Sequence, residues 1–144
     1  MREILFRGRS PRSRQWHEGE LFNATGKIPP YLPMILETSE TGRCDAFDVD
    51  PDTVGQFTGL TDKNGKKIFE GDIVHILGNQ NVDDWKSVDY TALIAFLDGG
   101  FCAIDGTIEE HAFRRYALAR LDFSLEVIGN IHDNPELLGG TDNG

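Results

Sequence analysis

The histidines and cysteines are the side chains of this sequence best suited to bind a metal or act in catalysis, but their spacing supports neither role. No second ligand lies one helical turn away, as in the zinc site of a hydrolase, from any of His17, His75, His111 and His132. Cys44 and Cys102 are too far apart for a CxxC unit, and we expect both to be free thiols. We therefore predict no catalytic, cofactor-binding or metal-binding residues and no enzyme activity. An enzyme would need one of these cysteines to meet a histidine and an acid from distant parts of the chain.

The glycine-rich segment from Gly59 to Lys67 differs from the phosphate-binding P-loop. Five residues separate Gly59 from Gly65 where a P-loop has four, and Lys67 stands where a Ser or Thr would hold magnesium. The run Asp62-Lys63-Asn64-Gly65 is also unlike a calcium-binding EF-hand loop, because its glycine comes too early and no closing glutamate follows. Its Asn-Gly pair instead predicts a hairpin turn.

Positive charge is concentrated at the start of the chain. The net charge is −10, yet the first 14 residues hold five arginines and one glutamate. The acidic remainder repels phosphate, so nucleic-acid contact would have to use this arginine arm. Trp85 is the aromatic residue that we expect at a contact surface, since Trp is enriched at binding hot spots, whereas Trp16 is expected to be partly buried. The predicted interaction surface comprises Arg7, Arg9, Arg12, Arg14 and Trp85.

Nothing in the sequence predicts secretion or membrane insertion. Ile4, Leu5 and Phe6 form the only apolar run near the start, which is too short for a signal peptide. No segment approaches the roughly 18 apolar residues that a membrane helix needs. We expect a soluble cytoplasmic protein that does not contact membranes.

The pattern of apolar residues predicts a mainly β protein with one short helix. Apolar and β-branched runs alternate with glycine-containing turns, including a hairpin at Asp98-Gly99-Gly100. Trp16 and the Leu21-Phe22 pair are predicted to be the two arms of a tight hairpin. Capping-box spacing from Thr107 to Glu110 and arginines toward the end favour a helix over residues 108–118.

Three stretches of the chain resemble the YopX family of phage and prophage proteins. They are the opening MREILFRG, the central TVGQFTGLTDKNGKKIFEGDIV from Thr53 to Val74, and the terminal LEVIGNIHDNPELL from Leu125 to Leu138. The resemblance implies an SH3-type barrel that begins near the central run, a variable N-terminal portion, a phage origin and self-association. It implies no reaction.

Together these patterns divide the chain into three parts. Residues 1–52 are predicted to form an N-terminal β-rich portion with the basic arm, residues 53–138 the SH3-type barrel, and residues 139–144 a disordered tail. The function that we expect is that of a phage accessory protein without enzymatic activity, acting through contacts with itself and with a phage or host protein. The alternatives are nucleic-acid contact through the arginine arm, or an acidic body that imitates nucleic acid and occupies a host protein.

Overall fold

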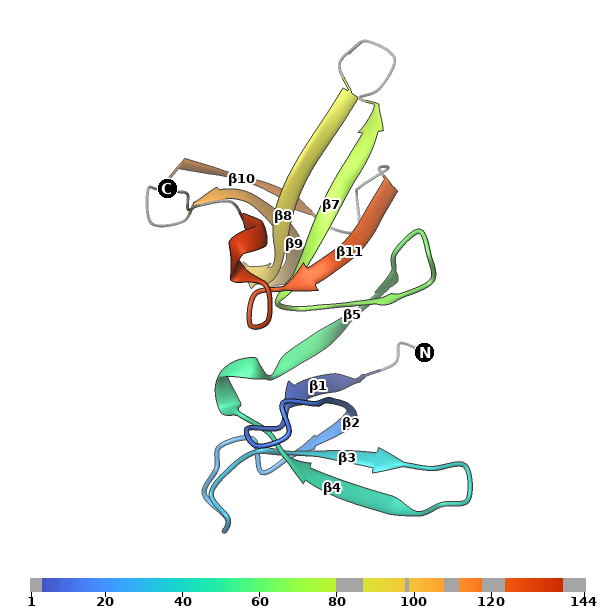
Figure 1. Ribbon diagram of the computed structural model, residues 1–144, viewed down its shortest axis with the longest axis vertical. Coiled ribbons are helices and arrows are strands. Elements are labelled where there is room, and N and C mark those ends of the chain that lie inside the picture. Colours follow the sequence, from blue (N-terminus) through green and yellow to red (C-terminus); the bar gives the residue numbers. More distant parts are fainter. Residues whose placement is uncertain (1–3, 80–86, 98, 108–111, 118–123, 139–144) are drawn as a thin grey trace. The chain divides into compact units, whose positions relative to one another are not determined.

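The computed structural model describes residues 4–79, 87–97, 99–107, 112–117 and 124–138. The chain divides into two compact units, Met1–Gly59 and Leu60–Gly144. Antiparallel strands dominate each unit (Figure 1), and the helices described are single 3-10 turns of three and four residues. The prediction of a mainly β protein is therefore confirmed.

The N-terminal unit is built on the larger of the two sheets. Hydrogen-bonded neighbours follow the order β4-β3-β2-β1-β5-β6, with antiparallel pairing from β4 to β5. The last residues of β5 belong to the second unit, as does β6. The elements of this part are β1 (Phe6–Arg9), β2 (Trp16–Phe22), β3 (Met34–Thr38), β4 (Cys44–Asp48), the 3-10 turn η1 (Pro51–Thr53) and β5 (Gly55–Thr61). Since β2 is one continuous strand, the tight hairpin predicted inside it is wrong.

The chain returns from the end of β4 to the end of β1. The amide of Val49 donates to the carbonyl of Pro33 at 3.0 Å, and the next amide, of Asp50, donates to the carbonyl of Arg9 at 2.9 Å. The Arg9 amide in turn donates to the Thr53 hydroxyl at 2.9 Å. These bonds curl the sheet, because its edge strand β4 is tied at one end to a strand of the sheet interior.

Close packing in this curled sheet requires a small residue in β2. Ile35, Val49 and Phe57 are among its buried apolar side chains. A Cβ atom added at Gly19 would lie 1.9 Å from the carbonyl oxygen of Leu36. No side chain fits at that distance, so glycine is needed where β2 approaches β3.

The second unit contains a five-stranded antiparallel sheet in the order β10-β9-β8-β7-β11. Its buried core is lined by aliphatic residues of β6 to β9, with Phe101, Leu125 and Val127 packed against them. The elements are β6 (Lys67–Phe69), β7 (Asp72–Asn79), β8 (Ser87–Leu97), β9 (Gly100–Thr107), β10 (Ala112–Ala117), β11 (Ser124–Asn130) and the 3-10 turn η3 (Pro135–Leu138).

The SH3-type barrel expected in this region is not confirmed. β10 and β11 stand at the two ends of the strand order, and within the described residues no pairing joins them. The sheet is therefore open. The division between the two units falls after Gly59, inside β5, whereas the sequence placed a boundary after residue 52. The tail at 139–144 lies outside the described residues.

The helix predicted over residues 108–118 is wrong where the structure describes it. Residues 112–117 form β10, which pairs with β9 from Ala112 opposite Thr107 to Ala117 opposite Cys102. Residues 108–111 and 118 lie outside the described part. Caps and ion pairs on a helix surface contribute only a few tenths of a kcal/mol to about 1 kcal/mol each. A continuous ladder of backbone hydrogen bonds to a neighbouring strand outweighs such local preferences.

Two turns were predicted correctly. Gly65, at a φ of 83°, closes a turn in which its amide donates to the carbonyl of Asp62 at 3.0 Å. β8 and β9 pair up to Leu97 opposite Gly100, which confirms the hairpin placed between them. Among the described residues, no helix has the length and apolar character needed to cross a membrane.

Candidate protein-interaction site

A loop of the N-terminal unit is organised by one side chain, that of Asn23. Its side-chain nitrogen donates to the carbonyls of Ile28 at 2.7 Å and Leu32 at 2.8 Å, and its side-chain oxygen accepts from the Ile28 amide at 3.0 Å. Asn23 itself has a φ of 58°, a conformation that asparagine tolerates better than most residues. The loop after β2 is therefore held by specific hydrogen bonds, although it has no regular secondary structure.

This loop exposes large apolar side chains. We define the apolar loop as residues 22–33, which includes the last residue of β2. Phe22 is 47% exposed, Ile28 53% and Tyr31 65%. The segment contains no acidic residue, and its one charged side chain is Lys27, in a chain with a net charge of −10. Scattered exposed apolar residues are ordinary, but several on one ordered segment are typical of a binding surface.

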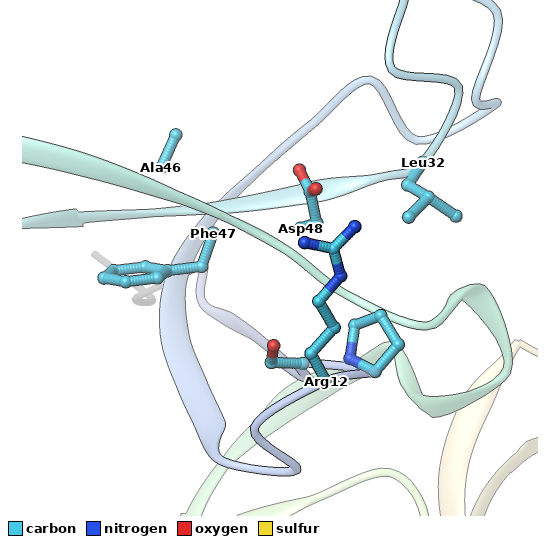
Figure 2. Close-up of a pocket in the computed structure, with 7 residues that line it drawn as sticks. Arg12, Leu32, Ala46, Phe47 and Asp48 are labelled. Atoms are coloured by element: carbon cyan, nitrogen blue, oxygen red, sulfur yellow. The ribbon is translucent and has the colours of Figure 1, made fainter.

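Next to the apolar loop lies a hollow of about 250 Å³. Figure 2 shows the Arg12 guanidinium directed toward the Asp48 carboxylate, both from residues that line the hollow. Both side chains are exposed, and these two described residues form no ion pair with each other. The hollow is lined by Ser10, Pro11, Arg12, Leu32, Ala46, Phe47 and Asp48.

The four arginines of the predicted contact surface lie in two different environments. Arg7 is only 8% exposed, and its guanidinium carbon lies 4.7 Å from the centre of the Trp16 ring. The guanidinium carbon of Arg9 lies 5.9 Å from the same ring. Both distances fit cation–π contacts, so these two arginines pack on the half-buried Trp16. Arg12 and Arg14 are exposed.

One residue of the predicted contact surface and one of the four histidines lie outside the described part of the chain. Trp85 of the predicted surface and His111 are both in segments of which the structure gives no placement. The aromatic residue that the structure does place beside the arginines is Trp16, and the sequence signal for it was its position a few residues after the arginine arm.

His17 belongs to an interaction that joins three strands. Its Nδ1 atom lies 3.1 Å from Oε2 of Glu37, and the same oxygen accepts from the Glu18 amide at 3.2 Å. The ring of His17 stacks on that of Phe47, with centroids 3.9 Å apart and planes 7° from parallel. This geometry connects β2 to β3 and β4, and it gives the histidine a structural role.

The cysteines lie in contrasting surroundings. Cys44 is exposed on β4, and Cys102 is buried in β9 as predicted; neither forms a disulfide. In the described segments, no three His, Cys, Asp or Glu side chains gather closely enough to hold a metal ion.

In the second unit, the side chain of Asp62 helps to fasten the turn after β5 to β11. Asp62 accepts from the amides of Asn64 at 2.8 Å and Lys66 at 2.9 Å, and its other oxygen accepts from the Val127 amide at 2.9 Å. The Lys63 amide donates to the carbonyl of Leu125 at 2.9 Å, close to the same point.

The electrostatics of Asp62 follow from these bonds. Burial by itself would raise the pKa of the carboxyl group, but the three backbone amides and the charge of Lys66 outweigh this effect. The pKa therefore lies below its ordinary value of 3.8. A carboxylate held in its charged form by backbone amides is suited to building a turn and not to accepting a proton in catalysis.

Comparison with known proteins gives the chain a family. The sequence profile described as YopX protein matches residues 5–139. The chain belongs to the YopX family. The matched range covers both units, and it includes most of the three stretches that carried the resemblance.

The fold of this YopX family member is similar to that of a solved structure. That structure is the crystal structure of protein EF1440 from Enterococcus faecalis, with 24% sequence identity and a TM-score of 0.50. The alignment covers 96% of this chain and 99% of that one. Identity at this level shows the fold alone. A comparison with curated proteins finds no match.

Proposed function

We propose that this YopX family member is a phage-encoded accessory protein of the bacterial cytoplasm that works by binding another protein, without enzymatic activity. The apolar loop is the observation that carries this proposal. It places three exposed apolar side chains on a segment whose backbone is fixed by Asn23. The phage origin is supported by membership of the family.

The order of the apolar loop is what suits it to binding. Association loses less conformational entropy when a contact segment already holds its bound conformation, and affinity rises accordingly. Tyr31 is of a residue type enriched among binding hot spots, and Ile28 adds aliphatic surface on the same loop. We therefore expect Tyr31 and Ile28 to enter an apolar pocket of the partner.

Charge narrows the kind of partner. Lys27 is the charged residue of the apolar loop, and acids are absent from residues 22–33. A partner pocket with an acidic rim would complement it. Two copies of a chain with a net charge of −10 repel each other, so we propose a different protein as the occupant of this loop. Self-association, which the family resemblance implied, remains a separate prediction.

The test compares two variants of the tagged full chain in host lysate and then with purified components. Ile28→Ser combined with Tyr31→Ser removes the apolar contacts, while Ile4→Ser serves as a matched control because Ile4 is 67% exposed and lies outside the apolar loop. The proposal expects a protein that the wild type and the control bind directly and that the double variant does not. A partner bound equally by the double variant would contradict it.

Nucleic-acid contact has weaker support. Arg7 and Arg9 pack on Trp16, which leaves Arg12 and Arg14 as the exposed described arginines of the arm. Few phosphate contacts give weak binding. The other alternative, imitation of nucleic acid by the acidic surface, rests on the net charge of −10 alone.

A further inference from the structure

β4 is an end strand whose outer backbone groups can be identified from its pairing. The Ser39 amide donates to the Arg43 carbonyl at 2.7 Å, and the Val49 amide donates to the Pro33 carbonyl at 3.0 Å. Residues of an antiparallel strand alternate between bonding to the neighbour and pointing away from it. Because Arg43 and Val49 bond toward β3, the backbone groups of the even-numbered residues point outward. These residues are Cys44, Ala46 and Asp48, and all three are exposed.

The hollow beside Arg12 lies along this outer edge. It is lined by Ala46, Phe47 and Asp48 of β4, by residues 10–12 and by Leu32. Figure 2 shows the Arg12 side chain reaching from its loop toward Asp48. A segment bound along β4 could therefore pair with the outward backbone groups of this strand, and it would lie close to the Arg12 guanidinium.

We infer that the outer edge of β4 accepts an extended segment of another protein as an added strand, and that Arg12 binds a carboxylate side chain of that segment. Strand addition gives affinity through backbone hydrogen bonds, and side chains at alternate positions give specificity. This surface shares Leu32 with the apolar loop but includes neither Ile28 nor Tyr31, so the inference goes beyond the function proposed above.

The charges of β4 favour a foreign segment over a second copy of the same strand. β4 itself carries Asp45 and Asp48 in five residues, and a second β4 would add two more aspartates to the same edge. Like charges on adjacent strands are destabilising. A segment that is mostly β-branched, with a single acid for Arg12, avoids this repulsion.

Proline at position 46 tests the strand addition directly. Proline lacks the backbone N–H that could donate to an added strand. Because the N–H at position 46 points away from β3, its loss leaves the bonds between β4 and β3 intact. Ala46→Ser is the matched control, because it keeps the amide. Arg12→Gln tests the carboxylate contact, and its control is Arg14→Gln, since Arg14 is also exposed but does not line the hollow.

The probe is a library of random short peptides displayed on an unrelated carrier and selected against the purified full chain. Enriched peptides are resynthesised with a fluorescent label, and their affinities are measured by anisotropy. We expect enriched peptides with a conserved acidic position. Their affinity should fall at least about tenfold with Ala46→Pro and about tenfold with Arg12→Gln, while both controls bind as the wild type does.

A second measurement does not depend on how the variants fold. Bound peptide should slow hydrogen exchange at the outward amide of Ala46 in the wild type, because that amide gains a hydrogen bond. The inference is overturned if no peptide is enriched, if enriched peptides bind Ala46→Pro equally well, or if exchange at Ala46 is unchanged. A dimer of this chain that Ala46→Pro dissociates would also overturn it, since the occupant would then be a second copy.

The peptide experiment can be separated from the test of the proposed function. The Ile28→Ser and Tyr31→Ser double variant leaves β4 and Arg12 unchanged, so we expect it to bind the selected peptides normally. Loss of peptide binding in this variant would show that the peptides sit on the apolar loop and would overturn the assignment to β4.

Discussion

The apolar loop and the turn after β5 are both organised by one polar side chain, but the two segments have different roles. In each, one short polar side chain makes three hydrogen bonds to nearby backbone groups: Asn23 in the loop and Asp62 in the turn. The bonds of Asn23 stay within its own loop, whereas one bond of Asp62 reaches β11, at Val127. The turn is thereby docked onto the sheet, and the loop is ordered yet leaves its apolar side chains in solvent.

This difference shows that order in a loop does not by itself reveal a role. A docked turn stabilises the fold, because its hydrogen bonds join segments far apart in the sequence. An ordered loop that is not docked contributes less to stability, and its fixed shape becomes useful when a second molecule binds. Substitutions at the two organising residues should therefore differ in what they damage.

The largest effect on stability is expected for Asp62→Ala. The substitution removes a charged acceptor from three amides, and hydrogen bonds to charged groups are among the stronger ones. We expect the free energy of unfolding to fall by about 3 kcal/mol, as measured by urea denaturation. Asp52→Ala, at an exposed acid, is the control. A loss as small as that of the control would mean that the bond to β11 does not stabilise the fold.

A smaller loss is expected for Asn23→Ala. It removes the three side-chain bonds and places alanine at a φ of 58°, which together should reduce the free energy of unfolding by about 2 kcal/mol. Asn23→Gly separates the two causes, because glycine adopts this φ without strain. We expect both variants to bind the partner of the apolar loop more weakly, in parallel with faster amide exchange at Ile28. Unchanged exchange there would refute the organising role of Asn23.

The contribution of Asp62 should also depend on pH. Its pKa is lowered in the folded protein, so the stabilisation is fully present above the ordinary value of 3.8 and is lost as the pH falls through the lower folded pKa. The stability difference between the wild type and Asp62→Asn should therefore shrink on acidification below that value. Urea denaturation in a series of acidic buffers measures this, and a difference that grows toward low pH would contradict the sign.

The smallest effect on stability is expected for the double substitution of Ile28 and Tyr31 by serine. Both side chains are more than half exposed, so the free energy of unfolding should change by no more than about 0.5 kcal/mol each. Thermal denaturation measures this. Comparison with Asn23→Ala then separates the residue that orders the loop from the residues that are expected to bind a partner. A large loss of stability would show that these residues pack against the fold.

Local sequence patterns predicted the features that depend only on residues close together in the chain. The Asn-Gly pair at Asn64 placed the turn, because few residues other than glycine accept a positive φ there. Apolar runs and glycine turns predicted the mainly β class and the hairpin between β8 and β9. The carboxylate bond from Asp62 to Val127 lay beyond such reasoning, since 65 positions separate the two residues.

Local patterns favoured the wrong element at one place, and they did not reveal how the arginines pack. Capping and charge spacing around residues 108–118 are typical of a helix, yet residues 112–117 pair with β9 as a strand. The four arginines were predicted together as part of one contact surface, and the structure places Arg7 and Arg9 on Trp16 while Arg12 and Arg14 remain exposed. Both outcomes depend on neighbours supplied by other strands.

By itself, the sequence determined the family, the β-rich class, the acidic charge and the two turns at Gly65 and between β8 and β9, because each of these follows from composition or from residues adjacent in the chain. Tertiary structure decided that Asn23 would organise an exposed apolar loop, that β4 would stand at the end of its sheet, and that Arg12 would project into the hollow beside it. These features arise from hydrogen bonds and packing between distant segments. Such contacts form only when the strands have paired, so a local sequence pattern does not reveal them.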